Sequence, residues 1–309
     1  MKKDLVSIKD LSALEIDGIL GLTEQLKTDR TKFSKVLAGK TLVLIFQKPS
    51  NRTRVSFEVG MYQLGGYSIY LRPDEINLGV RETLKDAAKT LSRYGDALVL
   101  RTFEHQNVLD MAQYSDKPVI NGLSDFSHPC QALADVYTIK ENFKKLKGVN
   151  LAYIGDGNNV CNSLLFVCSK LGININIATP KGYEPDSAVV KTAVEFAKDT
   201  SSRINLFNNP YEAVKGMDVL YTDVWASMGQ EDETERRKKL FKEFQINETL
   251  MKLAKKGVLI MHCLPAHRGE EITDEVIDSP NSVVFDQAEN RMHVQKAILI
   301  KLLGENKKL

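Results

Sequence analysis

Two hydroxyl side chains and two arginines crowd one short stretch of the chain, Ser50-Asn51-Arg52-Thr53-Arg54. An apolar, partly β-branched run at residues 41–46 precedes it and predicts a strand buried on both faces of a parallel sheet. A helical apolar pattern follows and ends at Gly65-Gly66. The N–H groups and the dipole at the start of such a helix favour an anion, and a guanidinium group matches phosphate oxygens. The stretch therefore predicts a phosphate pocket; the alternative is an ordinary capped helix with solvated arginines.

Other polar side chains also follow predicted strands, where ligands bind in open α/β sheets. Arg101 ends the apolar strand predicted at residues 97–100, and Asp223 follows the strand predicted at 219–222. His128 precedes Pro129 at the predicted start of a helix, so its ring can face a pocket. The alternatives are a surface arginine for Arg101 and a hydrogen-bonded structural histidine for His128.

Cys263 has three possible roles: a core thiol, a zinc ligand with His262 and His267, or a thiol beside a substrate. A zinc site would need further ligands at sensible spacing, and the sequence shows none, so we expect no metal. The glycine-containing turn at residues 155–159 lacks the third glycine of a dinucleotide site, because Val160 stands there. We therefore expect no cofactor.

Four motifs resemble one known family in their order and spacing. Ser-Asn-Arg-Thr-Arg at 50–54 is similar to the Ser-Thr-Arg-Thr-Arg signature of the aspartate/ornithine carbamoyltransferase family, and residues 128–131, His-Pro-Cys-Gln, agree with it. Residues 223–229 and 262–266 resemble the ornithine branch in particular. The resemblance covers essentially the whole chain. It implies transfer of the carbamoyl group of carbamoyl phosphate to the δ-amine of L-ornithine, giving L-citrulline and phosphate.

The resemblance also implies a role for each matching residue. Arg101 and His128 would polarise the carbonyl group and Cys263 would lie beside the reacting amine, which makes these three the expected catalytic residues. The family places the residue at Asn77, usually glutamine, in the neighbouring subunit's site and is built on trimers, so a homotrimer or a multiple of trimers is expected. Asn51 stands where the family usually has threonine. The expected carbamoyl phosphate contacts are Ser50, Asn51, Arg52, Thr53, Asn77, Arg101, His128, Pro129, Cys130, Gln131, Cys263, Leu264 and Arg291, and the expected ornithine contacts are Asn159, Asp223, Ser227 and Met228.

Two alternatives stay open for the function. One is a sister transcarbamylase that acts on another amine, such as putrescine or aspartate. The other is a catalytically silent relative that only binds phosphate or regulates a partner. The presence of Arg52, Arg101, His128 and Cys263 together argues against a silent protein.

Alternating strand and helix patterns predict an α/β fold with two domains, each a parallel sheet flanked by helices. We expect a carbamoyl phosphate-binding domain at residues 1–147 and an ornithine-binding domain at 148–286, with the active site in the interdomain cleft. The family resemblance implies that a final helix, at about residues 287–309, packs back on the first domain. Strands are predicted at 41–46, 67–71, 97–100, 119–120, 150–154, 173–178, 204–207, 219–222, 258–261 and 283–285, and helices after Ser12 and at 83–94, 108–114, 131–143 and 287–303.

Composition excludes several classes of protein. The chain has 309 residues, 43% apolar and 27% charged, with a net charge of +2. These values argue against a nucleic-acid or membrane surface, and the basic run at residues 235–239 is expected on the solvated face of a helix. No apolar run reaches the roughly 18 residues of a membrane span. The start of the chain lacks a signal-peptide pattern and the four cysteines lack CxxC spacing, so we expect a cytoplasmic protein with reduced thiols.

Overall fold

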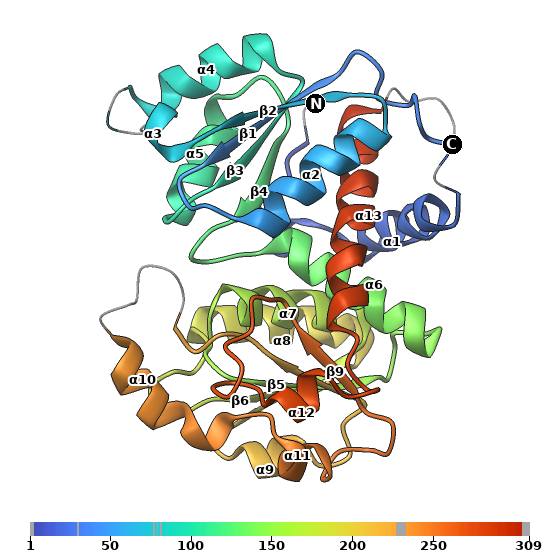
Figure 1. Ribbon diagram of the computed structural model, residues 1–309, viewed down its shortest axis with the longest axis vertical. Helices are drawn as coiled ribbons and strands as arrows, with labels where there is room; N and C mark the ends of the chain where they lie inside the picture. The colour runs from blue at the N-terminus through green and yellow to red at the C-terminus, as the bar shows by residue number, and fades with distance from the viewer. Residues whose placement is uncertain are drawn as a thin grey trace. The chain divides into compact units, whose positions relative to one another are not determined.

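The protein consists of two compact units, each built around one parallel sheet (Figure 1). The computed structural model describes residues 3–29, 31–76, 78, 80, 82–226 and 233–304. Unit 1 comprises residues 1–137 and 289–309, and unit 2 comprises residues 138–288. The chain passes between the units inside α6 (Pro129–Phe143) and again inside α13 (Val284–Leu303). The predicted α/β class with two parallel-sheet domains is confirmed.

The sheet of unit 1 has the strand order β2-β1-β3-β4, and every neighbouring pair is parallel. Helices flank it, with α4 and α5 on one side and α2 on the other (Figure 1). Leu98 and Leu100 pack with Ala88 of α4 and Met111 of α5 in a buried cluster. Its strands are β1 (Thr41–Phe46), β2 (Tyr67–Leu71), β3 (Ala97–Arg101) and β4 (Val119–Leu123). Its helices are α1 (Ala13–Thr28), α2 (Asn51–Gln63), α3 (Pro73–Ile76), α4 (Leu84–Tyr94), α5 (His105–Tyr114), the first part of α6 and most of α13.

The apolar pattern of α2 divides into two faces. Phe57, Met61 and Leu64, at the end of α2, are buried. Other apolar side chains of α2 are exposed, Tyr62 to 81%, and the edge strand β2 adds Tyr67 at 68%. We call the exposed set the α2–β2 apolar face; its members are Val55, Val59, Tyr62, Tyr67 and Ile69. Exposed apolar side chains on these two adjacent elements make this part of unit 1 a candidate interaction site.

The sheet of unit 2 has the strand order β7-β6-β5-β8-β9 and is also parallel. Helices α7 and α8 cover one face, and the short helices α9 to α12 lie on the other (Figure 1). On that second face Ile154, Leu220 and Ile260 pack with Leu250 and Val276. The strands are β5 (Asn150–Ile154), β6 (Asn174–Ala178), β7 (Ile204–Phe207), β8 (Val219–Thr222) and β9 (Leu259–His262), and the helices are α7 (Asn159–Leu171), α8 (Ser187–Thr200), α9 (Pro210–Ala213), α10 (Thr234–Phe241), α11 (Glu248–Met251) and α12 (Asp274–Ile277).

The strand predicted at residues 283–285 is wrong. The chain pairs with β9 only at an isolated bridge between Ser282 and Ile260, where Val283 N donates to Ile260 O at 3.0 Å. Helix α13 begins at Val284, and Asp286 in its first turn favours the helix start. The apolar residues therefore start a helix that the local pattern could not distinguish from a short buried strand.

Two further observations bear on the sequence predictions. The predicted domain boundary, after residue 147, lies in the loop between α6 and β5. Among the described residues, the structure contains no helix that is both long and apolar enough to span a membrane.

Candidate active site

The turn between β1 and α2 has the geometry of a capped helix start. Ser50 has extended backbone angles, φ −161° and ψ 116°, and its Oγ accepts a hydrogen bond from Thr53 N at 3.3 Å. This bond satisfies one of the backbone donors of the first turn. Asn51 is exposed, Arg52 is half-buried and Thr53 is buried. The predicted strand-to-helix turn is therefore present, with the dipole of a 13-residue helix behind it.

Two arginines from distant parts of the chain converge on Thr53. Arg101, the last residue of β3, donates from Nη1 to Thr53 Oγ1 at 3.5 Å. Arg291 of α13 donates from Nη2 to the same oxygen at 3.1 Å and from Nη1 to Gln131 Oε1 at 2.6 Å. Gln131 Nε2 in turn donates to Asp135 Oδ1 at 2.7 Å. All five side chains are buried, so the guanidinium groups are held in place beside the turn.

His128 is buried in the same positive environment. Burial lowers the pKa of His128 well below its ordinary value, and the charges of Arg291, Arg101 and Arg52 lower it further. The imidazole is therefore neutral near pH 7 and can donate one N–H group without carrying charge. Three arginines around a neutral histidine form an anion-binding site with a hydrogen-bond donor beside it.

Two residues next to His128 have structural roles in α6. Pro129 is the first residue of this helix, where its missing N–H costs nothing. Burial raises the pKa of Cys130 to about 12, and its Sγ donates to Asn121 O at 3.7 Å. Cys130 is therefore a neutral thiol that ties α6 to β4.

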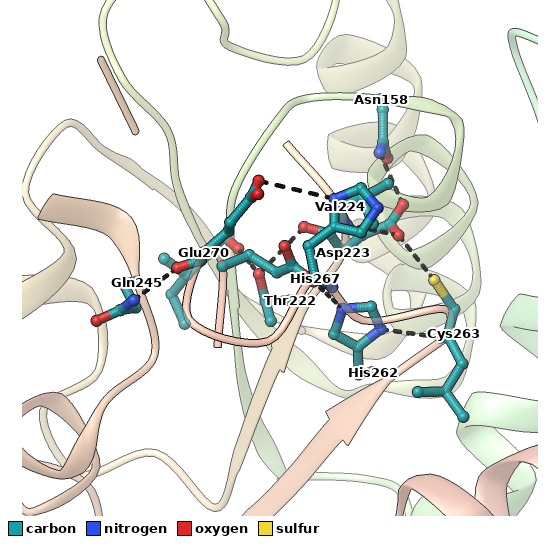
Figure 2. Close-up of polar contacts among 12 residues, drawn as sticks. Asn158, Thr222, Asp223, Val224, Gln245, His262, Cys263, His267 and Glu270 are labelled. Carbon is teal, nitrogen blue, oxygen red and sulfur yellow. Dashed lines mark hydrogen bonds and ion pairs between the residues drawn. The ribbon is translucent and has the colours of Figure 1, made fainter. Parts of the chain in front are cut away.

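A second polar cluster, in unit 2, is centred on Asp223 (Figure 2). Asp223 follows β8, and its Oδ1 accepts hydrogen bonds from Cys263 Sγ at 2.9 Å and from Val224 N at 2.8 Å. Its Oδ2 accepts from Asn158 Nδ2 at 2.9 Å. Asn159 is buried next to Asn158 at the start of α7. The carboxylate, the thiol and the amides thus lie within one site at the carboxyl ends of neighbouring strands.

Asn158 is a site residue that the sequence motifs did not identify, although they identified its neighbour Asn159. Asn158 is the N-cap of α7, and its Oδ1 accepts from Val160 N and Cys161 N while its amide nitrogen holds Asp223. Its place directly before a helix that follows a strand was the available signal.

A fully buried hydrogen-bonded pair, His262 and Glu271, supports the turn that carries Cys263. Leu264 N donates to His262 Nδ1 at 2.8 Å, so the other ring nitrogen, Nε2, carries the proton and donates to Glu271 Oε1 at 2.9 Å. Glu271 Oε1 also accepts from His267 N at 2.6 Å. Leu264 has φ 57°, a left-handed conformation that is unfavourable for a leucine. His262 and Glu271 therefore hold a strained turn in place, and Cys263 of this turn contacts Asp223.

Within the described part of the chain, two groups of side chains lie close enough to hold a metal ion, and both are visible in part in Figure 2. One group is Asp223, His262 and Cys263, and the other is His267, Glu270 and Glu271. Both ring nitrogens of His262 are already hydrogen-bonded, so this histidine would have to give up one bond to bind a metal. The observed bonds favour a structural role for His262.

Arg237 is buried, contrary to the expectation that residues 235–239 lie on a solvated face. Its Nη1 donates to Asp156 Oδ2 at 2.9 Å and to Trp225 O at 2.8 Å, and its Nε donates to Glu233 Oε2 at 2.9 Å. Burial raises the pKa of Asp156, and the Arg237 charge opposes this rise. The arginine thus ties the turn after β5 to the segment after β8. Local sequence gives no sign of this contact.

The structure therefore brings most of the predicted site residues together in two sets. Unit 1 holds one set, Ser50, Asn51, Arg52, Thr53, Arg101, His128, Pro129, Cys130, Gln131 and Arg291, and unit 2 holds the other, Asn159, Asp223, Cys263 and Leu264. Asn77, Ser227 and Met228 lie outside the described residues.

Comparison with known proteins adds two family matches. Residues 3–141 match the family described as "Aspartate/ornithine carbamoyltransferase, carbamoyl-P binding domain", and residues 147–302 match "Aspartate/ornithine carbamoyltransferase, Asp/Orn binding domain". The chain is 54% identical to the ornithine carbamoyltransferase of Thermococcus kodakarensis, over 98% of this chain and 96% of that protein. It is 52% identical to the Bacillus subtilis ornithine carbamoyltransferase, over 99% and 96%.

Solved structures agree with these matches. The ornithine carbamoyltransferase from Pyrococcus furiosus has a TM-score of 0.95 and 53% identity, covering 99% of this chain and 98% of that chain. The ornithine carbamoyltransferase from Thermus thermophilus has a TM-score of 0.89 and 44% identity, covering 98% and 99%.

Proposed function

The chain belongs to the aspartate/ornithine carbamoyltransferase family, and we propose that it transfers the carbamoyl group of carbamoyl phosphate to the δ-amine of L-ornithine. The products are L-citrulline and phosphate. The observation that carries the proposal is the convergence of Arg101 and Arg291 on Thr53, beside a neutral His128 at a helix start. The names of relatives more than half identical over nearly their whole length support the choice of ornithine.

Unit 1 residues bind and activate carbamoyl phosphate in this proposal. Ser50, Asn51, Arg52 and Thr53 hold the phosphate group at the helix start, with Arg291 beside them. Charge-assisted hydrogen bonds contribute about 1.5–3 kcal/mol each. The same donors stabilise the phosphate as it leaves with the electron pair of the broken C–O bond.

The carbonyl oxygen of the substrate is polarised by Arg101 and His128. Because His128 is neutral, it donates a hydrogen bond without adding a fourth positive charge to a site that already contains three arginines. Each such donor is worth about 10²–10³ in rate when it is held in place before the reaction. Gln131 contacts the carbamoyl NH₂ group, and Pro129 and Cys130 keep the start of α6 in register for it.

Unit 2 residues bind ornithine. Asp223 attracts an ammonium group of the amino acid, and Asn159, Ser227 and Met228 complete its contacts. The attacking δ-amine must first lose a proton, because an ammonium ion has no lone pair. Cys263 lies beside that amine with its thiol bonded to Asp223, and the Cys263-Leu264 backbone contacts the carbamoyl group. No cofactor takes part in this chemistry.

We also propose an oligomeric state, a metabolic role, a cellular location and domain boundaries. The α2–β2 apolar face supports a homotrimer or a multiple of trimers, with Asn77 serving the neighbouring subunit's site. A mass measurement in solution tests this.

A relative from Pyrococcus furiosus, 54% identical, is named anabolic, which supports a role in arginine biosynthesis. The four cysteines carry thiols, in keeping with a cytoplasmic protein. Residues 1–147 with the C-terminal helix form the carbamoyl phosphate domain and residues 148–286 the ornithine domain.

The experiment is a colorimetric assay for ureido products with carbamoyl phosphate and one amine at a time. L-Ornithine, putrescine and L-aspartate serve as the three amines. We expect product with ornithine at a kcat/KM at least about a hundredfold above the other two, because only ornithine offers the full set of contacts. Preference for putrescine or aspartate would assign the chain to a sister enzyme. No product with any amine, from protein that binds phosphate, would identify a silent relative.

A further inference from the structure

The segment directly before His128 forms a closed turn around the hydroxyl group of Ser124. Ser124 N donates to Ser127 O at 3.0 Å, and Ser127 N donates back to Ser124 Oγ at 3.2 Å. Asn121 Nδ2, from β4, donates to the same Oγ at 3.2 Å. We call residues 124–127 the Ser124 turn. Its shape sets the backbone from which the His128 ring projects.

His105, the first residue of α5, contacts three consecutive residues of the Ser124 turn. Its Nδ1 lies 2.8 Å from Ser124 Oγ, its backbone N donates to Asp125 Oδ1 at 2.8 Å, and its ring centre lies 5.0 Å from that of Phe126. Asp125 thereby caps α5, whose own N-cap residue, Glu104, makes no side-chain cap bond. Helix α5 and the turn thus hold each other in place.

The hydrogen bonds around Ser124 favour one protonation state of His105. A hydroxyl group offers one proton and two lone pairs. Asn121 and Ser127 both donate to Ser124 Oγ, which leaves two acceptors for the Ser124 proton, Nδ1 of His105 at 2.8 Å and Ser127 O at 3.4 Å. The shorter bond, to His105, requires an unprotonated Nδ1. A protonated His105 would point a third N–H group at an oxygen with no lone pair left.

The surroundings of His105 keep it in that state. Burial lowers the pKa of His105 below its ordinary value, although Asp125 on the turn and Asp10 near the N-terminus oppose the shift. Glu104, the preceding residue, is exposed to solvent. Neutral His105 is thus the form present at neutral pH, and acid converts it to the form that the turn does not accommodate.

We propose that His105 is a positioning residue: through Ser124 it holds the turn that aims His128 at the carbamoyl group. This inference rests on the proposed function of His128. It predicts that protonation of His105 lowers turnover at acid pH, in addition to the loss caused by protonation of the amine substrate.

The test compares two uncharged replacements of similar polarity. Asn places an amide oxygen where Nδ1 of His105 lies, whereas Gln places its amide where Nε2 lies. We expect His105→Asn to keep kcat at pH 8 within about threefold of wild type, and His105→Gln to lose about tenfold or more, because small displacements of a catalytic group are costly. The KM for ornithine should change in neither variant. His105→Asn should also retain a larger share of its pH 8 activity at pH 5.5 than wild type does.

Equal kcat values for the Asn and Gln variants would overturn the proposal, as would identical acid limbs for wild type and His105→Asn. If the Gln variant fails to fold, Ser124→Ala replaces it in a double-variant comparison with His105→Asn. Because both changes act on one hydrogen bond, the double variant should lose no more activity than Ser124→Ala alone, and multiplied losses would refute the pairing. Wild-type enzyme that forms no citrulline would instead contradict the proposed function.

Discussion

Removal of the Arg291 side chain is the most informative change in unit 1. Arg291 is almost fully buried, and its fork donates to Gln131 Oε1 at 2.6 Å and to Thr53 Oγ1 at 3.1 Å. Thr53 and Gln131 are themselves predicted carbamoyl phosphate contacts, so we expect the fork to turn its two donors to the bound substrate. Arg291→Ala removes the fork, and Arg291→Lys keeps the charge but supplies a point donor in its place.

The expected magnitude follows from two hydrogen bonds that the Arg291 fork is proposed to donate to the substrate. Hydrogen bonds from a charged group contribute about 1.5–3 kcal/mol each, so two of them give about 3–6 kcal/mol. Each 1.4 kcal/mol is a factor of ten, which predicts a loss of about 10²–10⁴ in kcat/KM for carbamoyl phosphate in Arg291→Ala. Arg291→Lys should lose about tenfold to a hundredfold, because one bond and the planar geometry disappear while the charge remains.

Arg291→Ala should also change the titration of His128. The Arg291 charge is the first of three charges that, together with burial, lower the pKa of His128, so its removal should raise that pKa. NMR titration of histidine-labelled protein measures the shift, with His128→Asn for assignment. Arg291→Lys should leave the titration near that of wild type.

Kinetics at saturating ornithine and calorimetric titration with phosphate together give the result. Arg93→Ala, which removes an exposed arginine from α4, is the control and should change neither. If Arg291→Ala keeps more than about a tenth of wild-type kcat/KM, two charged donors cannot act on the substrate, and the reasoning from the structure fails.

Three further predictions concern other residues. Asp223→Asn should weaken ornithine binding by about tenfold or more while phosphate binding stays near wild type, because only a cationic ligand needs the carboxylate. Calorimetric titration with each ligand measures the two affinities, and an equal loss of affinity for both ligands would contradict the assignment. Glu271→Gln should lower the free energy of unfolding by about 1–3 kcal/mol, since Glu271 accepts from His262 Nε2 and from a backbone N–H in a fully buried site; an unchanged urea midpoint would count against this. Burial lowers the pKa of His128 and of His293, the latter to about 4. Below about pH 6.5 the unfolded chain therefore binds more protons than the folded chain, and the free energy of unfolding should fall as the pH drops from about 6.5 to 4. His293→Gln should make the melting temperature less dependent on pH in thermal unfolding scans.

The strands were the most predictable part of the fold. The strand at residues 150–154 has the predicted bounds, because a strand covered by helices on both faces is a continuous apolar run between polar turns. Residues 283–285 have the same local character and yet begin a helix, since their conformation depends on contacts with β9 that no local pattern encodes.

The site was predictable where a strand end or a helix cap marked it. The capped turn at Ser50 and the positions of Arg101 and Asp223 follow from this rule. Arg291 and Thr53 lie 238 residues apart in the sequence, and only the family resemblance linked them. Arg237 was missed because its role depends on a tertiary hydrogen bond to Asp156. Asn158 was missed although its cap position was visible in the sequence, because its bond to Asp223 is tertiary.

The proposed reaction can be tested most directly by following the transferred carbon. Carbamoyl phosphate labelled with ¹³C at the carbonyl is incubated with the protein and L-ornithine, and ¹³C and ³¹P NMR spectra are recorded together. We expect the ureido resonance of citrulline and the inorganic phosphate resonance to grow in a one-to-one ratio, with Arg52→Ala slowing both to the same extent. Phosphate release without a labelled ureido product would show that the arginine cluster binds carbamoyl phosphate but that the chain does not transfer its carbamoyl group to ornithine.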